Sequence, residues 1–187
     1  MLPLPTDMVG SPFSLCHLPP TREIAAVLYD VFSSDAENMR FWLRGKNISS
    51  VDEVFDGIKR AYESENMYMY YILIQDKIVG EIGFASIDMD NKSVYVDYWL
   101  APNVRGQRMI DRFLFCIEDM AFNMLKMKHI LLRIDAENIA SRKVAERNSY
   151  VLNKIVKSDK VWSDGSFHDE CEYSKLKSDW VKERKNA

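Results

Sequence analysis

The segment from position 98 to position 110 has the sequence Tyr98-Trp99-Leu100-Ala101-Pro102-Asn103-Val104-Arg105-Gly106-Gln107-Arg108-Met109-Ile110. A run of aromatic and β-branched residues ends at Leu100, and a turn containing Pro102 and Gly106 follows. An apolar pattern of helical period starts at Ile110. The segment therefore predicts a strand, a tight turn and the first turn of a long helix.

Such a turn is a natural place for an anion. The first amides of a helix have no partner within the helix, and the helix dipole adds partial positive charge there. Arg105 and Arg108 add two full charges, and guanidinium groups suit phosphate oxygens. An Arg-Gly pair also occurs in purely structural turns, so this segment alone leaves both interpretations open.

The residues before the turn predict an antiparallel meander. Ranges 68–74, 78–87 and 93–100 are rich in β-branched and aromatic residues, and short connections at 75–77 and 88–92 separate them. Both faces of the third strand carry bulky side chains, so we expect a central strand that is covered on two sides.

The residues after the turn predict a crossover connection. Range 110–125 has apolar residues at three- and four-residue steps, which is typical of a long helix, and 129–134 is an apolar strand. A strand, a helix packed back on it and a second strand form a right-handed parallel unit. We expect a short helix at 139–147. The expected closing strands are 151–156, 160–162 and 170–176.

The N-terminal third is expected to be mostly helical. Residues 1–12 contain three prolines and a glycine and predict an irregular arm, which a short strand at 13–17 follows. Expected helices span 22–33, 36–44 and about 50–63, and Ser50 with Glu53 resembles a capping box for the third. Residues 181–187 are expected to be a frayed tail. Together, residues 1–187 predict one α+β domain.

Composition excludes several classes of protein. The net charge of −3 argues against a basic nucleic-acid footprint, and no apolar run approaches the roughly 18 residues of a membrane span. Cys16, Cys116 and Cys171 have neither CxxC nor metal-ligand spacing, which predicts reduced thiols and no metal site. The first residues lack a secretory pattern. We expect a cytoplasmic monomer or homodimer without nucleic-acid or membrane partners.

Three separated motifs then point to one family. The first is Tyr98-Trp99-Leu100-Ala101-Pro102 followed by Arg105, and the second is Asn138-Ile139-Ala140-Ser141 with Val144-Ala145-Glu146-Arg147. The third is Asp164-Gly165-Ser166-Phe167-His168-Asp169, before the last strand. In this order they resemble the GNAT superfamily of N-acetyltransferases, and most closely its Rim-type branch, which acetylates N-termini of ribosomal proteins.

The resemblance implies a fold, a co-substrate and a binding site. The sheet would be mixed and mostly antiparallel, with helices on both faces and a splayed parallel pair formed by 93–100 and 129–135. Acetyl-CoA would lie in the gap of that pair with its pyrophosphate on the turn, and backbone amides near Leu100 would contact the thioester oxygen. The residues implied to bind it are Trp99, Leu100, Arg105, Gly106, Gln107, Arg108, Met109, Ile110, Asn138 and Ser141.

Two positions depart from the family motif. Arg108 stands where the family has Gly, and Ile110 stands where it has Gly or Ala, which is the milder change. If the backbone at Arg108 is left-handed, a side chain there costs on the order of 1–2 kcal/mol. A guanidinium bond to the pyrophosphate would contribute about 1.5–3 kcal/mol. These magnitudes permit cofactor binding.

The resemblance also implies how the transfer is assisted. An amine would attack the thioester directly in a ternary complex. Ser141 would donate to the leaving thiolate, unless it is only a solvent-facing serine in a first helical turn. Asn138 would contact the pantetheine amide and could also cap the helix. His168, beside Asp169, is expected to be structural or to shape the substrate site, because no nucleophile motif accompanies it.

The general base stays open between Asp159, Glu81 and Asp97, since relatives commonly carry Glu where this chain has Tyr95. A weak base suits an α-amine acceptor, which is about 14% neutral at pH 7, whereas a lysine is only about 0.04% neutral. We therefore expect a protein N-terminus or a small-molecule amine as the acceptor. Ribosomal proteins, polyamines, aminoglycosides and amino sugars all fit.

Two other functions stand as alternatives to acetyl transfer. A non-catalytic acyl-CoA-binding module with a degenerate GNAT fold would explain Arg108 and the missing strand Glu. A nucleotide-binding α/β protein is disfavoured, because the sequence has neither a Gly-rich dinucleotide fingerprint nor a P-loop lysine.

Overall fold

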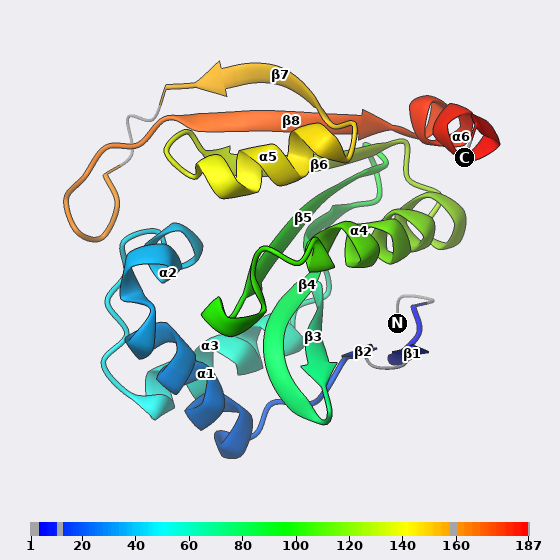
Figure 1. Cartoon of the computed structure of the whole chain (residues 1–187). Helices are drawn as coiled ribbons and strands as arrows, with labels where there is room; N and C mark the ends of the chain where they lie inside the picture. Colours follow the sequence, from blue (N-terminus) through cyan, green and yellow to red (C-terminus); the bar gives the residue numbers. More distant parts are fainter. Residues whose placement is uncertain (1–3, 11–12, 158–160, 187) are drawn as a thin grey trace.

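The computed structural model describes residues 4–10, 13–157 and 161–186, and within them eight strands form one mixed sheet (Figure 1). The strand order is β1-β2-β3-β4-β5-β6-β8-β7. The strands are β1 (Asp7–Gly10), β2 (Phe13–Cys16), β3 (Tyr68–Ile74), β4 (Lys77–Asp88), β5 (Ser93–Leu100), β6 (His129–Asp135), β7 (Val151–Val156) and β8 (Glu170–Leu176). β5 and β6 pair in parallel and the other neighbours pair antiparallel, so the predicted crossover and central strand are confirmed.

Helices cover both faces of this sheet. They are α1 (Arg22–Ser34), α2 (Ala36–Leu43), α3 (Val51–Tyr62), the 3-10 turn η1 (Pro102–Val104), α4 (Met109–Asp119), the π-helical turn η2 (Met120–Met124), α5 (Ile139–Arg147) and α6 (Lys177–Asn186). The expected α+β architecture is therefore present. No helix in the described ranges is both long and apolar enough to cross a bilayer.

The predicted helix starts are visible as caps. The hydroxyl of Thr21 accepts from the Ile24 amide at the start of α1, at 3.2 Å. Ser50 accepts from the Glu53 amide at 3.2 Å, which is half of the predicted capping box. The Glu53 carboxylate accepts from the amide of Ser49, at 3.0 Å, so the reciprocal bond falls one residue before the cap. Each cap satisfies amides that the helix leaves unpaired.

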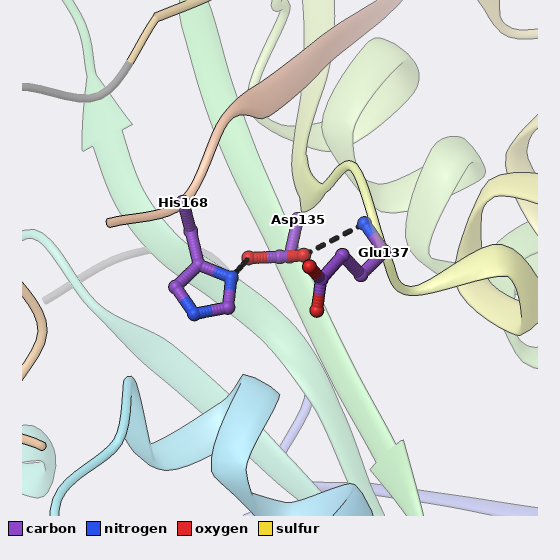
Figure 2. A group of neighbouring side chains, drawn as sticks. All are labelled: Asp135, Glu137 and His168. Atoms are coloured by element: carbon purple, nitrogen blue, oxygen red, sulfur yellow. Dashed lines mark hydrogen bonds and ion pairs between the residues drawn. The ribbon is translucent and has the colours of Figure 1, made fainter. Parts of the chain in front are cut away.

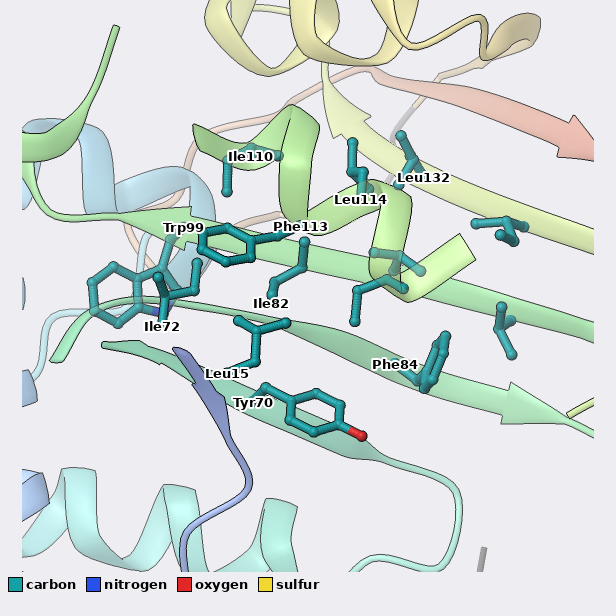
Figure 3. Packing of buried hydrophobic residues seen from close by; sticks show 14 of the residues in the cluster. Leu15, Tyr70, Ile72, Ile82, Phe84, Trp99, Ile110, Phe113, Leu114 and Leu132 are labelled. Atoms are coloured by element: carbon teal, nitrogen blue, oxygen red, sulfur yellow. The ribbon is translucent and has the colours of Figure 1, made fainter. Parts of the chain in front are cut away.

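Alternate residues of β5 point to opposite layers of the molecule. The indole of Trp99 lies edge-on to Phe32 of α1 and Trp42 of α2, whereas the phenol of Tyr98 contacts α5. On the Tyr98 side, the apolar stripe of α4 is buried over the central strands, as the labelled side chains in Figure 3 illustrate. The strand alternation therefore sends one side chain toward α1 and α2 and the next toward α4 and α5.

Three expected boundaries were wrong. Part of the supposedly irregular arm, Asp7–Gly10, is strand β1, which pairs with β2 at the sheet edge. The expected frayed tail, 181–187, is helical through Asn186, because α6 is anchored by the buried indole of Trp180 against Phe122. Both features depend on partners distant in sequence, and local composition does not reveal them.

The third difference lies around the expected strand 160–162. Lys160 falls outside the described residues, and Val161 forms only an isolated bridge with Phe167. The expected helix 110–125 is also not uniform, since it changes from α4 to the π-helical η2 at Met120. Met120, Ala121 and Phe122 are all buried in that wider turn.

Candidate active site

β5 and β6 pair over only part of their length. Ladder partners run from Ser93–His129 to Tyr95–Leu131, and beyond them the two strands are no longer paired with each other. A cleft of about 500 Å³ opens between the unpaired ends. It is lined by residues of β5 and β6, by the α4 start, by α5 and, on the other side, by α2. The splayed parallel pair expected from the sequence is thus present.

The start of α4 forms one end of this cleft. Arg108 is the residue before the helix, and its backbone is left-handed, with φ of 53° and ψ of 29°. No side chain in the described part of the chain caps this helix, so its first amides stay available. Gly106 has φ of 77°, and nothing lies within 4 Å of where a Cβ would be. The turn is open and donor-rich, which suits a diphosphate.

The two arginines of the turn have different surroundings. Arg105 donates from Nε to the Leu100 carbonyl at 2.8 Å and forms an ion pair with Asp35, between α1 and α2. Its guanidinium is thus engaged within the protein, which the sequence did not anticipate. Arg108 is exposed, and no carboxylate among the described residues lies within 4 Å of its guanidinium. Of the two, Arg108 is the one with a free charge for a ligand.

Ser141 is held against a tyrosine that sequence analysis assigned no chemical role. Its hydroxyl donates to Tyr98 Oη at 2.8 Å, and the phenol donates to the Ser141 carbonyl at 3.3 Å. Burial raises the pKa of Tyr98, so its phenol stays protonated. Both side chains line the cleft. Tyr98 could have been suspected from the alternation of β5, which puts it on the same face as α5.

Asn138 has the capping role considered for it. Its Oδ1 accepts from the Ser141 amide at 3.1 Å, which fixes the first turn of α5 and the position of Ser141. Asn138 also lines the cleft, so its amide nitrogen can still meet a ligand. The predicted pantetheine contact stays a prediction.

The candidate bases are distributed unevenly. Asp159 lies outside the described residues. Glu81 is buried away from the cleft wall and accepts from Trp99 Nε1 at 3.0 Å; burial raises its pKa to about 7. Asp97 lines the cleft, and burial raises its pKa while Arg44 and Arg133 oppose the shift. Of the two described acids, Asp97 is the one placed to face an acceptor.

Tyr95 lies in the paired part of β5, away from the cleft lining. Its phenol accepts from Arg133 at 3.1 Å and donates to Glu172 at 3.3 Å. Tyr95, at a position where relatives commonly have Glu, therefore belongs to a polar network on the sheet surface.

Gln107 is exposed and does not line the cleft. The other residues expected to bind the cofactor do line it.

A buried acid at the end of β6 has a histidine partner. Asp135 lines the cleft, and its Oδ2 lies 2.7 Å from Nδ1 of His168. Its other oxygen accepts from the Glu137 amide at 2.8 Å, and Figure 2 shows His168 and Glu137 on either side of the Asp135 carboxylate. Burial raises the pKa of Asp135. The sequence motifs contain all three residues, but only the fold brings His168 to Asp135.

These three side chains place atoms of types that also ligate metals within 4.8 Å of one another. The Glu137 carboxylate is engaged by Arg40 at 3.2 Å, and Asp135 is engaged by His168. The group is therefore held together by ion pairs and by the backbone bond from Glu137 to Asp135. That the protein needs no metal stays a prediction.

The cleft thus passes through the sheet between two chemically different mouths. The α4 and α5 side offers amides, Arg108 and the Ser141–Tyr98 pair. The α2 side offers apolar side chains and the carboxylates of Asp97 and Asp135. A phosphorylated donor and a cationic acceptor could meet in the gap. The family model described as an acetyltransferase (GNAT) domain matches residues 15–151 of the chain.

The chain belongs to the GNAT acetyltransferase family. Among curated proteins, this GNAT chain is 25% identical over 162 residues to YdaF of Bacillus subtilis (strain 168), provisionally named a ribosomal N-acetyltransferase. The match covers 84% of the chain and 88% of YdaF. It is 26% identical over 96 residues to the ribosomal-protein-serine acetyltransferase of Escherichia coli (strain K12), covering 51% of the chain and 54% of that protein.

Solved GNAT structures share the fold over nearly the whole chain. RimL, a ribosomal L7/L12 α-N-protein acetyltransferase solved with coenzyme A, superimposes with a TM-score of 0.78 at 19% identity. The match covers 90% of this chain and 96% of RimL. MccE, a microcin C7 self-immunity acetyltransferase solved with acetyl-CoA and AMP, gives 0.75 at 20% identity, covering 89% and 93%. At these identities the likeness establishes the fold alone.

Proposed function

We propose that this GNAT enzyme transfers the acetyl group of acetyl-CoA to a primary amine by direct attack in a ternary complex. The α-amine at the N-terminus of a protein is the acceptor we favour. The observation that carries the proposal is the cleft itself: a donor-rich helix start and a carboxylate-bearing mouth open on opposite sides of one splayed strand pair.

The α4 side of the cleft fits the donor. Acetyl-CoA supplies an activated thioester together with a diphosphate that needs compensating charge. The uncapped amides of α4, the open backbone at Gly106 and the free guanidinium of Arg108 would hold that diphosphate. Arg105 would act indirectly, because its bond to the Leu100 carbonyl and its pairing with Asp35 hold the turn against α1 and α2.

The Ser141–Tyr98 pair would serve the leaving group. A departing thiolate needs a proton or a hydrogen-bond donor, and two hydroxyls stand together at the cleft wall. Because burial raises the pKa of Tyr98, the phenol keeps its proton at neutral pH and serves as a hydrogen-bond donor, and Ser141 can turn its own donor toward sulfur. The Asn138 cap keeps Ser141 in position.

The oxyanion contact near Leu100 needs a more specific donor than the sequence suggested. The Ala101 amide is already bonded to the Val79 carbonyl at 2.8 Å, and the Leu100 carbonyl accepts from Arg105. The Ala101 amide is therefore a poor donor for the oxyanion. We assign the contact instead to a backbone amide earlier in β5, in the part of the strand that is not paired with β6.

Support for an α-amine acceptor comes from two directions. An α-amine is about 14% neutral at pH 7 and so needs only a weak base, and the α2 side of the cleft offers the carboxylates of Asp97 and Asp135, whose pKa values burial raises. The curated relatives at 25% and 26% identity are named for ribosomal substrates. Small amines remain the alternative acceptors.

The test is a thiol-release assay with acetyl-CoA and two matched peptides. One peptide has a free N-terminal serine and no lysine, and the other has a blocked N-terminus and one lysine. We expect release with the first at least tenfold faster than with the second, and a mass gain of one acetyl group on the α-nitrogen. Acetyl-CoA binding by calorimetry without release on peptides, polyamines or amino sugars would favour the non-catalytic module instead.

A further inference from the structure

A chain of polar contacts leads from the cleft wall to solvent. Asp135 Oδ2 lies 2.7 Å from His168 Nδ1, and the side chains are only 4% and 6% exposed. His168 Nε2 lies 2.8 Å from the hydroxyl of Ser166. That hydroxyl donates to Asp164 Oδ1 at 2.5 Å, and Asp164 is exposed. The contacts join a buried acid in the cleft to a carboxylate at the surface.

The short Ser166–Asp164 contact favours one arrangement of the protons. Ser166 has one hydroxyl proton, and the 2.5 Å bond to Asp164 uses it. His168 Nε2 must then carry a proton to donate to Ser166, which leaves Nδ1 without one in the neutral ring. Nδ1 then faces Asp135 Oδ2 at 2.7 Å with a free lone pair. A proton that Asp135 accepts therefore has its next acceptor within reach.

We propose that Asp135 accepts the proton lost by the acceptor amine, and that His168 and Ser166 pass a proton on to Asp164 and solvent. This inference rests on the proposed acetyl transfer. Asp135 is the catalytic residue in this scheme, whereas His168 and Ser166 act through it. Nothing in the sequence motifs assigned a proton path to these residues.

The proton balance of the reaction requires such a route. As the nitrogen–carbon bond forms and the carbon–sulfur bond breaks, the attacking amine loses one proton and the thiolate gains one. An acceptor that arrives as ammonium must lose a further proton before attack. Sulfur gains its proton on the Ser141–Tyr98 side, where solvent replaces it, so both protons that an ammonium acceptor loses have to leave on the acceptor side. One proton is released in net. Each hop along the chain moves one proton from donor to acceptor and creates no net charge inside.

The geometry is held in place by its neighbours. The His168 ring stacks on the indole of Trp162, with centroids 3.8 Å apart and an angle of 13°. The Glu137 amide holds the other oxygen of Asp135, which leaves Oδ2 directed at the ring. Burial raises the pKa of Asp135 toward the range in which a carboxylate is an effective base.

The charges around the pair are nearly balanced. Glu137 is paired with Arg40, and Glu170, which faces Asp135 across the β6–β8 ladder, is paired with Arg44. Other charged groups near the path, among the described residues, are Asp97 with Arg133 on the sheet face, Asp164 at the outer end, and Asp169 with its partner Lys157.

Chemical rescue separates a proton path from a structural role. His168→Ala leaves a ring-sized space on Trp162, and the assay is thiol release with the free N-terminal peptide, with and without added imidazole. We expect turnover about 10- to 100-fold below the wild type and an unchanged acetyl-CoA Kd. Millimolar imidazole should restore at least part of the rate. In a series of substituted imidazoles, the restored rate should rise with the pKa of the imidazole.

His17→Ala is the matched control. His17 also stacks on an aromatic ring, that of Tyr68 at 3.9 Å, but it lies outside the cleft lining. It should turn over like the wild type and gain nothing from imidazole. Should His168→Ala fail to fold, His168→Asn keeps a hydrogen-bonding group near the Nδ1 position and must still lose rate.

The outcomes are distinct. A His168 variant with wild-type turnover, or one whose loss imidazole does not relieve, overturns the proton path while leaving acetyl transfer intact. A wild type that binds acetyl-CoA but acetylates no amine overturns the proposed function itself.

Discussion

Arg108→Gly is the substitution on which the assignment of the cofactor turn depends most directly. Position 108 is left-handed, with φ of 53°, and the GNAT motif has glycine there. A left-handed non-glycine residue destabilises the folded state by on the order of 1–2 kcal/mol, which glycine would relieve. The greater freedom of glycine in the unfolded chain offsets about 0.5–1 kcal/mol of this gain. The variant should therefore be more stable by about 0.5–1 kcal/mol, or roughly 1–4 °C in Tm.

The same change removes the free guanidinium at the α4 start. If Arg108 bonds the diphosphate, its loss costs about 1.5–3 kcal/mol, which is roughly a 10- to 150-fold weaker acetyl-CoA affinity. Thermal unfolding without ligand and calorimetric titration with acetyl-CoA measure the two effects separately. We expect them to have opposite signs: a more stable protein that binds its co-substrate less tightly.

Lys126→Gly is the matched control, since Lys126 is an exposed lysine with φ of 58° that lies outside the cleft. It should show the same gain in Tm and no change in affinity. A more stable Arg108→Gly variant with unchanged or tighter binding would refute the phosphate contact. A less stable variant would refute the strain argument, because the backbone would then not be relieved by glycine.

The other predictions address the leaving group, the anchoring of the turn and a buried acid. Ser141→Ala and Tyr98→Phe should each lower kcat about tenfold or more with little change in acetyl-CoA Kd; equal losses in both would contradict the leaving-group role. Arg105→Ala and Asp35→Asn should weaken acetyl-CoA binding by similar, several-fold factors in titrations, since the ion pair holds the turn; an unaffected Asp35→Asn would mean that Arg105 contacts the ligand itself. Burial raises the pKa of Glu81 from 4.5 to about 7, so the folded state keeps a proton that the unfolded state loses, and stability falls as pH rises through that window. Denaturant unfolding should therefore find Glu81→Gln more stable than the wild type by on the order of 2–3 kcal/mol at pH 8, with the difference vanishing near pH 4; a constant difference would exclude titration of Glu81 as its cause.

The kinds of secondary-structure element and their order follow from patterns in the sequence. Period-two runs gave the meander, the return to a helical period after Pro102 gave α4, and chain connectivity required β5 and β6 to be parallel. The turn from Arg105 to Ile110 was also legible, because an uncapped helix start and a glycine with open space are local properties. The left-handed backbone at Arg108 agrees with the glycine that the family motif has at this position.

Which side chains meet depends instead on the packing of distant segments. Asp35 reaches Arg105, Tyr98 reaches Ser141 and His168 reaches Asp135 across long separations in sequence. The edge strand β1 and the helix α6 also exist through partners contributed by remote segments. Periodicity records the face on which a residue lies, whereas a hydrogen bond between distant segments depends on how whole layers pack. For that reason the fold and the open turn before α4 were predictable, and the contact between Asp135 and His168 was not.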